Sequence, residues 1–165
     1  MTAPDFEAFV REQLPRLVRY AVMLTGEREL AQDLVQDVMV KAHRNWSRVS
    51  AAQHPDRYAT AMVTNAYLSW RRRWAVRHVF ATGHLPEVAV DASDGADHAD
   101  LWHRLAALPQ RQRAAVVLRY YEGMPDPEIA DVLGCSPTTV RVHIHRALKT
   151  LRLELTDSTA SLPTT

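Results

Sequence analysis

Apolar residues recur at helical spacing along most of the chain, and this pattern predicts an all-α protein. In Phe6 to Leu24 they form one stripe, but Pro15 interrupts it and predicts a break or kink that leaves two short helices. Glu29 to Trp46 carries apolar residues on one face and polar residues on the other. Ser47 to His54 predicts a loop, after which Pro55 opens a third long helix. The chain contains only 5 glycines and no long β-branched alternation, so no sheet is expected.

The second half of the chain predicts shorter helices. Asp100 to Leu108 and Gln110 to Tyr121 both have apolar residues at helical spacing, and a proline separates them. Another helix is expected from Pro127 to Leu133, and a further one begins near Pro137. The last ten residues, 156–165, have no apolar stripe and are expected to form a disordered tail.

The segment that starts at Pro125, PDPEIADVLGCSPTTVRVHIHRALKTL, predicts a helix-turn-helix. Gly134 tolerates the positive φ of a sharp turn, Ser136 is placed to cap the second helix, and Pro137 suits its first position. Arg141 to Arg152 contains four Arg or Lys residues and no carboxylate, so one face is basic and suits the major groove of DNA. The opposite face is apolar, at Val140, Ile144, Leu148 and Leu151. An amphipathic hairpin with a solvated basic face is the alternative interpretation.

Charge divides the chain into three parts, although the formal net charge is only +1. Residues 1–80 carry an excess of four positive charges and residues 101–165 an excess of two. Between them, 81–100 contains five carboxylates and no Lys or Arg. Two basic parts on either side of an acidic one indicate two nucleic-acid-facing modules and a tether. We therefore expect helical domains at 5–80 and 99–155, joined by a flexible acidic linker at 81–98.

Several classes of protein and site are disfavoured by the sequence. The single cysteine, Cys135, cannot form an intramolecular disulfide, which fits a reducing compartment. No apolar run has membrane-spanning length and the N-terminus lacks a signal-peptide pattern, so a cytoplasmic protein without membrane insertion is expected. His143 and His145 lie two residues apart on a helix and face different directions, so no metal site is expected. No glycine-rich phosphate loop or hydrolase motif appears, and we expect neither a cofactor nor an enzyme.

Three segments together resemble the sigma-70 family of bacterial RNA polymerase sigma factors. DLVQDVMVKAHRNW (Asp33 to Trp46) resembles the helix by which the family binds core RNA polymerase, and Arg57 to Arg73 resembles the helix that reads the −10 promoter element. Leu108 to Arg152 resembles the C-terminal domain that reads the −35 element. Two such domains joined by a short linker resemble the extracytoplasmic-function (ECF) group. The resemblance covers about Asp5 to Leu155, and three motifs in order are more specific than one.

The resemblance implies a core-polymerase-binding face on the helix before Trp46. Such a face needs exposed polar side chains that can meet a coiled coil of the polymerase. An ordinary solvated helix face is the alternative. The residues expected there are Asp33, Gln36, Asp37, Val40, Lys41 and Arg44.

The resemblance also implies capture of unpaired −10 bases, which stacking on aromatic rings and basic contacts to phosphates can achieve without catalysis. Asn65 lies where the family reads a −10 base, and an amide can pair with a base edge. Core packing is the alternative for Tyr58, and it is the favoured interpretation for Tyr67 and Trp70. A basic surface patch is the alternative for the arginines, Arg77 among them. The residues expected to meet −10 DNA are Trp46, Arg48, Arg57, Tyr58, Asn65, Arg71, Arg72 and Arg73.

In the helix-turn-helix the resemblance implies base and backbone contacts to the −35 element. Arg141 or Arg146 can bond bidentately to guanine. His143 departs from the Arg or Lys that relatives often carry, which weakens the assignment of a phosphate contact there. The residues expected to meet −35 DNA are Arg111, Thr138, Arg141, Val142, His145, Arg146 and Lys149.

The function that the resemblance implies is direction of core polymerase to promoters and opening of the DNA. Its partners would be core RNA polymerase, the −35 duplex and the −10 single strand, with an anti-sigma factor as a further possibility. A stand-alone helix-turn-helix regulator is the main alternative, and it would bind duplex DNA tightly without polymerase. An adaptor that docks polymerase without reading DNA is a third, which the basic second helix disfavours.

Overall fold

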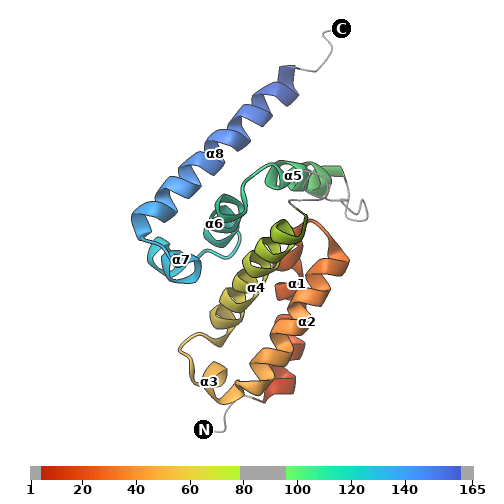
Figure 1. Ribbon diagram of the computed structural model, residues 1–165, viewed down its shortest axis with the longest axis vertical. Coiled ribbons are helices and arrows are strands. Elements are labelled where there is room, and N and C mark those ends of the chain that lie inside the picture. Colours follow the sequence, from red (N-terminus) through yellow and green to blue (C-terminus); the bar gives the residue numbers. More distant parts are fainter. Residues whose placement is uncertain (1–4, 79–95, 161–165) are drawn as a thin grey trace. The chain divides into compact units, whose positions relative to one another are not determined.

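The structure is a computed structural model that describes residues 5–78 and 96–160, and every element within those ranges is a helix (Figure 1). The all-α fold class expected from the sequence is therefore confirmed. The chain divides into two compact units, Met1–Asp91 and Ala92–Thr165, each with its own packed helices. The greater part of the expected linker, 81–95, lies outside the described residues.

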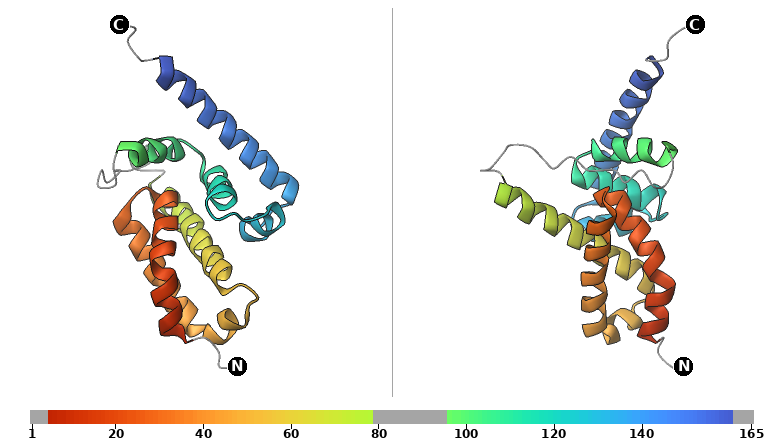
Figure 2. Two further views of the ribbon diagram at one scale, coloured as in Figure 1. Left: turned by 180° about the vertical axis from the view of Figure 1, so that it is seen from behind. Right: turned by 90° about the vertical axis from the view of Figure 1, so that its right-hand side faces the viewer.

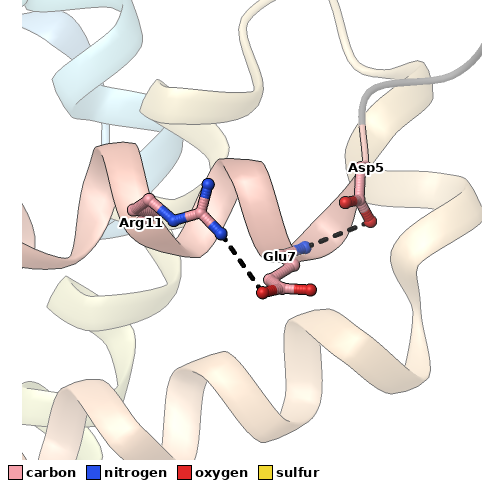
Figure 3. A network of polar contacts seen from close by, with 3 residues as sticks. All are labelled: Asp5, Glu7 and Arg11. Atoms are coloured by element: carbon pink, nitrogen blue, oxygen red, sulfur yellow. Dashed lines mark hydrogen bonds and ion pairs between the residues drawn. The ribbon is translucent and has the colours of Figure 1, made fainter.

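The first unit contains α1 (Phe6–Thr25), α2 (Arg28–Arg44), α3 (Trp46–Ala51) and α4 (Pro55–His78). The three long helices α1, α2 and α4 all pack against one another, and the short α3 packs against α2 and α4. Asp5 caps α1 by accepting a hydrogen bond from the Glu7 amide, and Arg11 pairs with Glu7 along the same helix (Figure 3). The core of this unit is apolar, at Leu17, Leu24, Val35, Val38, Val49 and Val63.

The expected interruption of α1 at Pro15 is wrong, because the helix runs unbroken from Phe6 to Thr25. Pro15 lacks one backbone donor and therefore removes one hydrogen bond of the helix. On either side of it, Phe9, Leu17 and Leu24 are buried in the same core. Their packing stabilises the helix more than the missing bond destabilises it, since helices in proteins depend largely on tertiary contacts.

The loop expected from Ser47 to His54 contains the helix α3, so that expectation is also wrong for most of its length. Val49 is fully buried and fixes one side of the helix in the core. The Trp46 ring packs against Phe6 and Phe9 of α1, with ring centroids 5.3 and 5.1 Å apart. These contacts stabilise a short helix whose own sequence carries no cap.

The second unit contains α5 (Ala96–Ala106), α6 (Gln110–Tyr120), α7 (Asp126–Leu133) and α8 (Pro137–Ala160). The long α8 packs against α5, α6 and α7 (Figure 2). Arg113 is buried, and its guanidinium Nη2 donates to the carbonyls of Ala106 and Leu108 at 2.9 and 3.1 Å. It thereby satisfies carbonyl groups at the end of α5 that have no partner within the helix.

Two helix ends differ from the expected boundaries. α5 begins at Ala96, so the last residues of the expected linker are helical, because no glycine or proline follows Gly95 until Pro109. α8 continues to Ala160, so the first half of the expected disordered tail is helical, and 161–165 lies outside the described residues. The first residue after Leu153 that ends helices is Pro163, which explains the extension.

Candidate functional site

The helix-turn-helix predicted from the sequence is confirmed by α7, a tight turn and α8. Gly134 ends α7 with a φ of 66°, a conformation that glycine adopts without steric strain. The Ser136 hydroxyl accepts a hydrogen bond from the Thr139 amide at 3.1 Å, as expected of an N-cap. Ile129 on α7 and Val140 on α8 are fully buried, so the two helices share one core.

The outward face of α8 gathers the residues that were expected to meet −35 DNA. Buried Val140, Ile144 and Ala147 fix which side of α8 faces inward. Arg141 donates to the Thr138 hydroxyl at 3.2 Å, and this contact holds its guanidinium along the helix. The exposed residues of the face are Thr138, Arg141, Val142, His145, Arg146 and Lys149.

Arg111 reaches the helix-turn-helix from α6. Its guanidinium Nη1 donates to the carbonyl of Leu133 at 2.7 Å, at the last residue of α7. The Leu133 carbonyl has no donor within its own helix, so this bond satisfies it. The bond also connects α6 to the start of the turn. Sequence reasoning placed Arg111 among the phosphate contacts and missed this structural role, because the two residues lie 22 positions apart.

His143 lies half-buried beside the basic face rather than on it. Its Nδ1 atom is buried and has no hydrogen-bond partner within the described residues. Burial lowers the pKa of His143 from its ordinary value, and the positive charges of Arg111 and Arg146 lower it further. The side chain is therefore neutral at pH 7 and adds no charge to the face.

A surface hollow that sequence reasoning missed lies beside the first turn of α8. It is lined by Arg119 from α6, Asp126 from α7 and Arg141 from α8, among others. Arg119 and Asp126 form an ion pair across it. The hollow thus brings two guanidinium groups close to the expected base-reading face, with one of them already paired to a carboxylate.

In the first unit, α2 presents the face that was expected to bind polymerase. Leu34, Val35 and Val38 are buried on its inner side. Among the charged residues of the outer side, Val40 leaves 52% of its surface exposed. Single exposed apolar residues are also common on ordinary solvated surfaces, so this exposure pattern fits both interpretations of the face. All six expected residues are exposed: Asp33, Gln36, Asp37, Val40, Lys41 and Arg44.

The residues expected to meet −10 DNA are only partly brought together. Asn65 is exposed on α4, and Arg48 is exposed on α3. Trp46 instead packs on the rings of α1, so much of its indole is used within the fold. Arg71 is only 8% exposed and does not share the open surface of its neighbours. The remaining residues are half-exposed (Arg57, Tyr58) or exposed (Arg72, Arg73, Arg77).

The two aromatic residues for which core packing was favoured are covered by the fold. Tyr67 is 1% exposed, and Trp70 is half-buried on the same helix. A set of buried polar contacts between α1 and α4 was not foreseen. The Tyr20 and Thr64 hydroxyl oxygens lie 2.6 Å apart, and Arg16 donates to the Thr60 hydroxyl at 3.1 Å.

Two other kinds of feature are absent from the part of the chain that the structure describes. Within residues 5–77 and 100–153 no group of three or more His, Cys, Asp or Glu side chains could hold a metal ion. None of the helices described is both long enough and apolar enough to cross a membrane.

Two family models match the chain and coincide with the two units. The model for sigma-70 region 2 matches residues 9–76, and the model for sigma-70 region 4 matches residues 98–151. The chain therefore belongs to the sigma-70 family of RNA polymerase sigma factors.

Curated relatives place it within one group of that family. It is 37% identical over 153 residues to the RNA polymerase sigma-E factor of Streptomyces avermitilis, covering 92% of this chain and 85% of that protein. It is 29% identical over 154 residues to the ECF RNA polymerase sigma factor SigL of Mycobacterium tuberculosis, covering 90% and 87%. The chain is a sigma factor of the ECF type, and the match over α1 to α4 favours this function over a stand-alone regulator.

Solved structures agree with this placement. The sigma factor RpoE in complex with the anti-sigma factor NepR from Bartonella quintana matches with a TM-score of 0.80 at 26% identity, covering 92% of this chain and 97% of that one. CnrH in complex with the cytosolic domain of CnrY matches with a TM-score of 0.62 at 25% identity, covering 92% and 88%.

Proposed function

We propose that three exposed faces divide the work of promoter recognition. The outer face of α8 binds the −35 element, α2 binds core polymerase, and α3 with the exposed side of α4 captures −10 bases. The observation that carries the proposal is the outer face of α8, which joins three cationic residues, Arg141, Arg146 and Lys149, on a capped recognition helix.

On α8 the positions suggest distinct contacts. Arg141 lies in the first turns of the helix, which enter the major groove most deeply in this motif, so it reads a guanine edge. Arg146 and Lys149 lie further along and contact phosphates. Arg111 is engaged with Leu133, and its role is to hold the turn rather than to bind DNA.

On the first unit, the Asn65 amide reads a −10 base, while Arg48 and Arg57 contact the DNA backbone near that base. Arg72, Arg73 and Arg77 contact the neighbouring phosphates of the same DNA. Arg71 and Trp46 are left out of this surface, because the fold buries one and packs the other on α1. Both support the surface instead of forming it.

The protein lends recognition and strand opening to polymerase and contributes no catalytic group of its own. It works in the cytoplasm, where core polymerase and promoter DNA are found. Since both matched structures are complexes with an anti-sigma factor or a cytosolic partner domain, we extend the same kind of partner to this chain.

Transcription by purified core polymerase on a pool of promoter fragments, with and without the protein, tests the proposal. We expect transcripts that need both components and share one −35/−10 pattern. No transcripts, together with tight binding of the free protein to duplex DNA, would instead support the stand-alone regulator.

A further inference from the structure

A buried chain of hydrogen bonds connects α1 to α4 in the first unit. Tyr20, Thr60 and Thr64 have no exposed surface. The Thr64 hydroxyl donates to the carbonyl of Thr60 at 2.8 Å, and its oxygen lies 2.6 Å from the Tyr20 hydroxyl. A threonine hydroxyl has one proton, so Tyr20 is the donor in that second bond.

One helical turn earlier, α1 makes a second polar contact with the same helix. The Arg16 guanidinium donates to the Thr60 hydroxyl and to the carbonyl of Asp56, each at 3.1 Å. The two contacts are spaced as Arg16 and Tyr20 are on α1 and as Thr60 and Thr64 are on α4. They therefore constrain both the rotation of α4 and its position along its own axis.

Apolar packing alone constrains that position less strictly. Ala59, Val63 and Tyr67 are buried on α4, and apolar contacts have no preferred direction. Cores with the right volume keep their stability through considerable repacking and lose uniqueness first. A hydrogen bond is directional, and a buried hydroxyl without its partner is strongly disfavoured. The bond between Tyr20 and Thr64 thus selects one placement of α4 among several that the apolar residues would accept.

We propose that Tyr20 and Thr64 are positioning residues for −10 recognition. Asn65 is the residue after Thr64 and lies on the exposed side of α4, so the buried bond determines where the Asn65 amide meets a base. Specific base readout requires such fixed geometry, since a displacement of about 1 Å weakens a positioned contact severely. The inference rests on the proposed function, which assigns base reading to Asn65.

The test compares Tyr20→Phe, Thr64→Val and the double variant in the full-length protein. Each single variant removes one partner of the buried bond between Tyr20 and Thr64 and is expected to unfold at lower denaturant concentration. The double variant removes both partners and should recover most of that loss. Transcription with core polymerase is then measured on a promoter with its preferred −10 base and on one with that base replaced.

We expect the double variant to bind core polymerase as the wild-type protein does but to discriminate the two promoters about tenfold less well. Thr64→Ser keeps the hydroxyl and should keep the discrimination. A double variant that is as stable as the wild-type protein and equally discriminating would overturn the proposal, because the bond would then serve stability only.

The Asn65→Ala variant separates failure of this inference from failure of the proposed function. If Asn65→Ala leaves discrimination unchanged, Asn65 does not read a base and the proposed function of α4 fails. If Asn65→Ala abolishes discrimination while the double variant retains it, base reading stands and only the positioning role is overturned.

Discussion

The Arg111 guanidinium donates a hydrogen bond to the carbonyl of Leu133 at 2.7 Å, and it thereby joins α6 to the residue before the turn of the helix-turn-helix. Because Gly134 follows directly, the bond lies at the hinge between α7 and the recognition helix. The structure thus gives Arg111 a role in shaping the DNA-binding unit.

Replacing Arg111 by alanine should lower the free energy of unfolding by about 1 kcal/mol, a value below the usual range for charged hydrogen bonds because the side chain is exposed and solvent screens its charge. Denaturant unfolding measures this loss. The salt dependence of −35 binding should stay the same, since the guanidinium is not a phosphate contact. A slope reduced by about one unit would instead show that Arg111 binds DNA directly.

Lys149 and Arg141 should differ in what their loss does to DNA binding. Lys149→Ala should weaken binding to all sequences alike and reduce the salt slope by about one unit, because it removes one phosphate contact. Arg141→Ala should cost about 1–3 kcal/mol on the preferred −35 sequence and much less on a sequence lacking the guanine. Titrations at several salt concentrations on both duplexes distinguish the two. Equal losses on both sequences for Arg141→Ala would contradict a base contact.

His143 should make the stability of the second unit depend on pH. The pKa of this residue in the folded protein is lowered below its ordinary value of 6.5, so folding favours the neutral form. The stability that the neutral His143 side chain contributes is therefore fully present above pH 6.5, and it is lost as the pH falls from there towards the pKa of the folded protein. Unfolding of the wild-type protein and His143→Gln is compared at pH 7.5 and 5.5.

The difference between these two proteins should shrink or reverse at the lower pH, because only the wild-type protein has a residue 143 that binds a proton more readily in the unfolded than in the folded state. His145→Gln, two residues along on the exposed face, is the matched control. The same change in both variants would show that the burial of His143 has no such effect.

Val40→Glu should abolish binding to core polymerase with little effect on folding, because Val40 is 52% exposed on the face of α2. The added charge would be buried at an interface that now receives an apolar side chain. Val76→Glu on α4 is a matched control, since that valine is 73% exposed in the same unit. Association with core polymerase is measured for both. If Val40→Glu binds core polymerase as well as Val76→Glu does, the outer face of α2 does not form the polymerase interface.

Local chemistry explains why much of the second unit could be predicted from the sequence. Gly134, Ser136 and Pro137 each act on the backbone within a few residues, and the structure shows the positive φ and the cap bond where they were expected. The exposed face of α8 follows from the helical period once Val140 and Ile144 are placed inward.

The differences arise where tertiary contacts decide. The continuity of α1 through Pro15 and the formation of α3 depend on burial and on rings brought together from α1 and α3. Arg71 belongs to a run of arginines in the sequence, yet the fold buries it while its neighbours stay exposed. The contacts of Arg111 with Leu133 and of Tyr20 with Thr64 join residues 22 and 44 positions apart. The periodicity and local motifs of one sequence do not predict which residues meet at such a separation.

A sigma factor of this kind should open promoter DNA together with core polymerase, and the reactivity of −10 thymines towards permanganate reports that opening. The template is a promoter found by the transcription assay, incubated with core polymerase, with the protein, or with both. We predict reactive −10 thymines only when both are present, and a loss of this reactivity in Val40→Glu. Thymines that stay unreactive with both components, although the free protein protects the −35 duplex, would contradict this function.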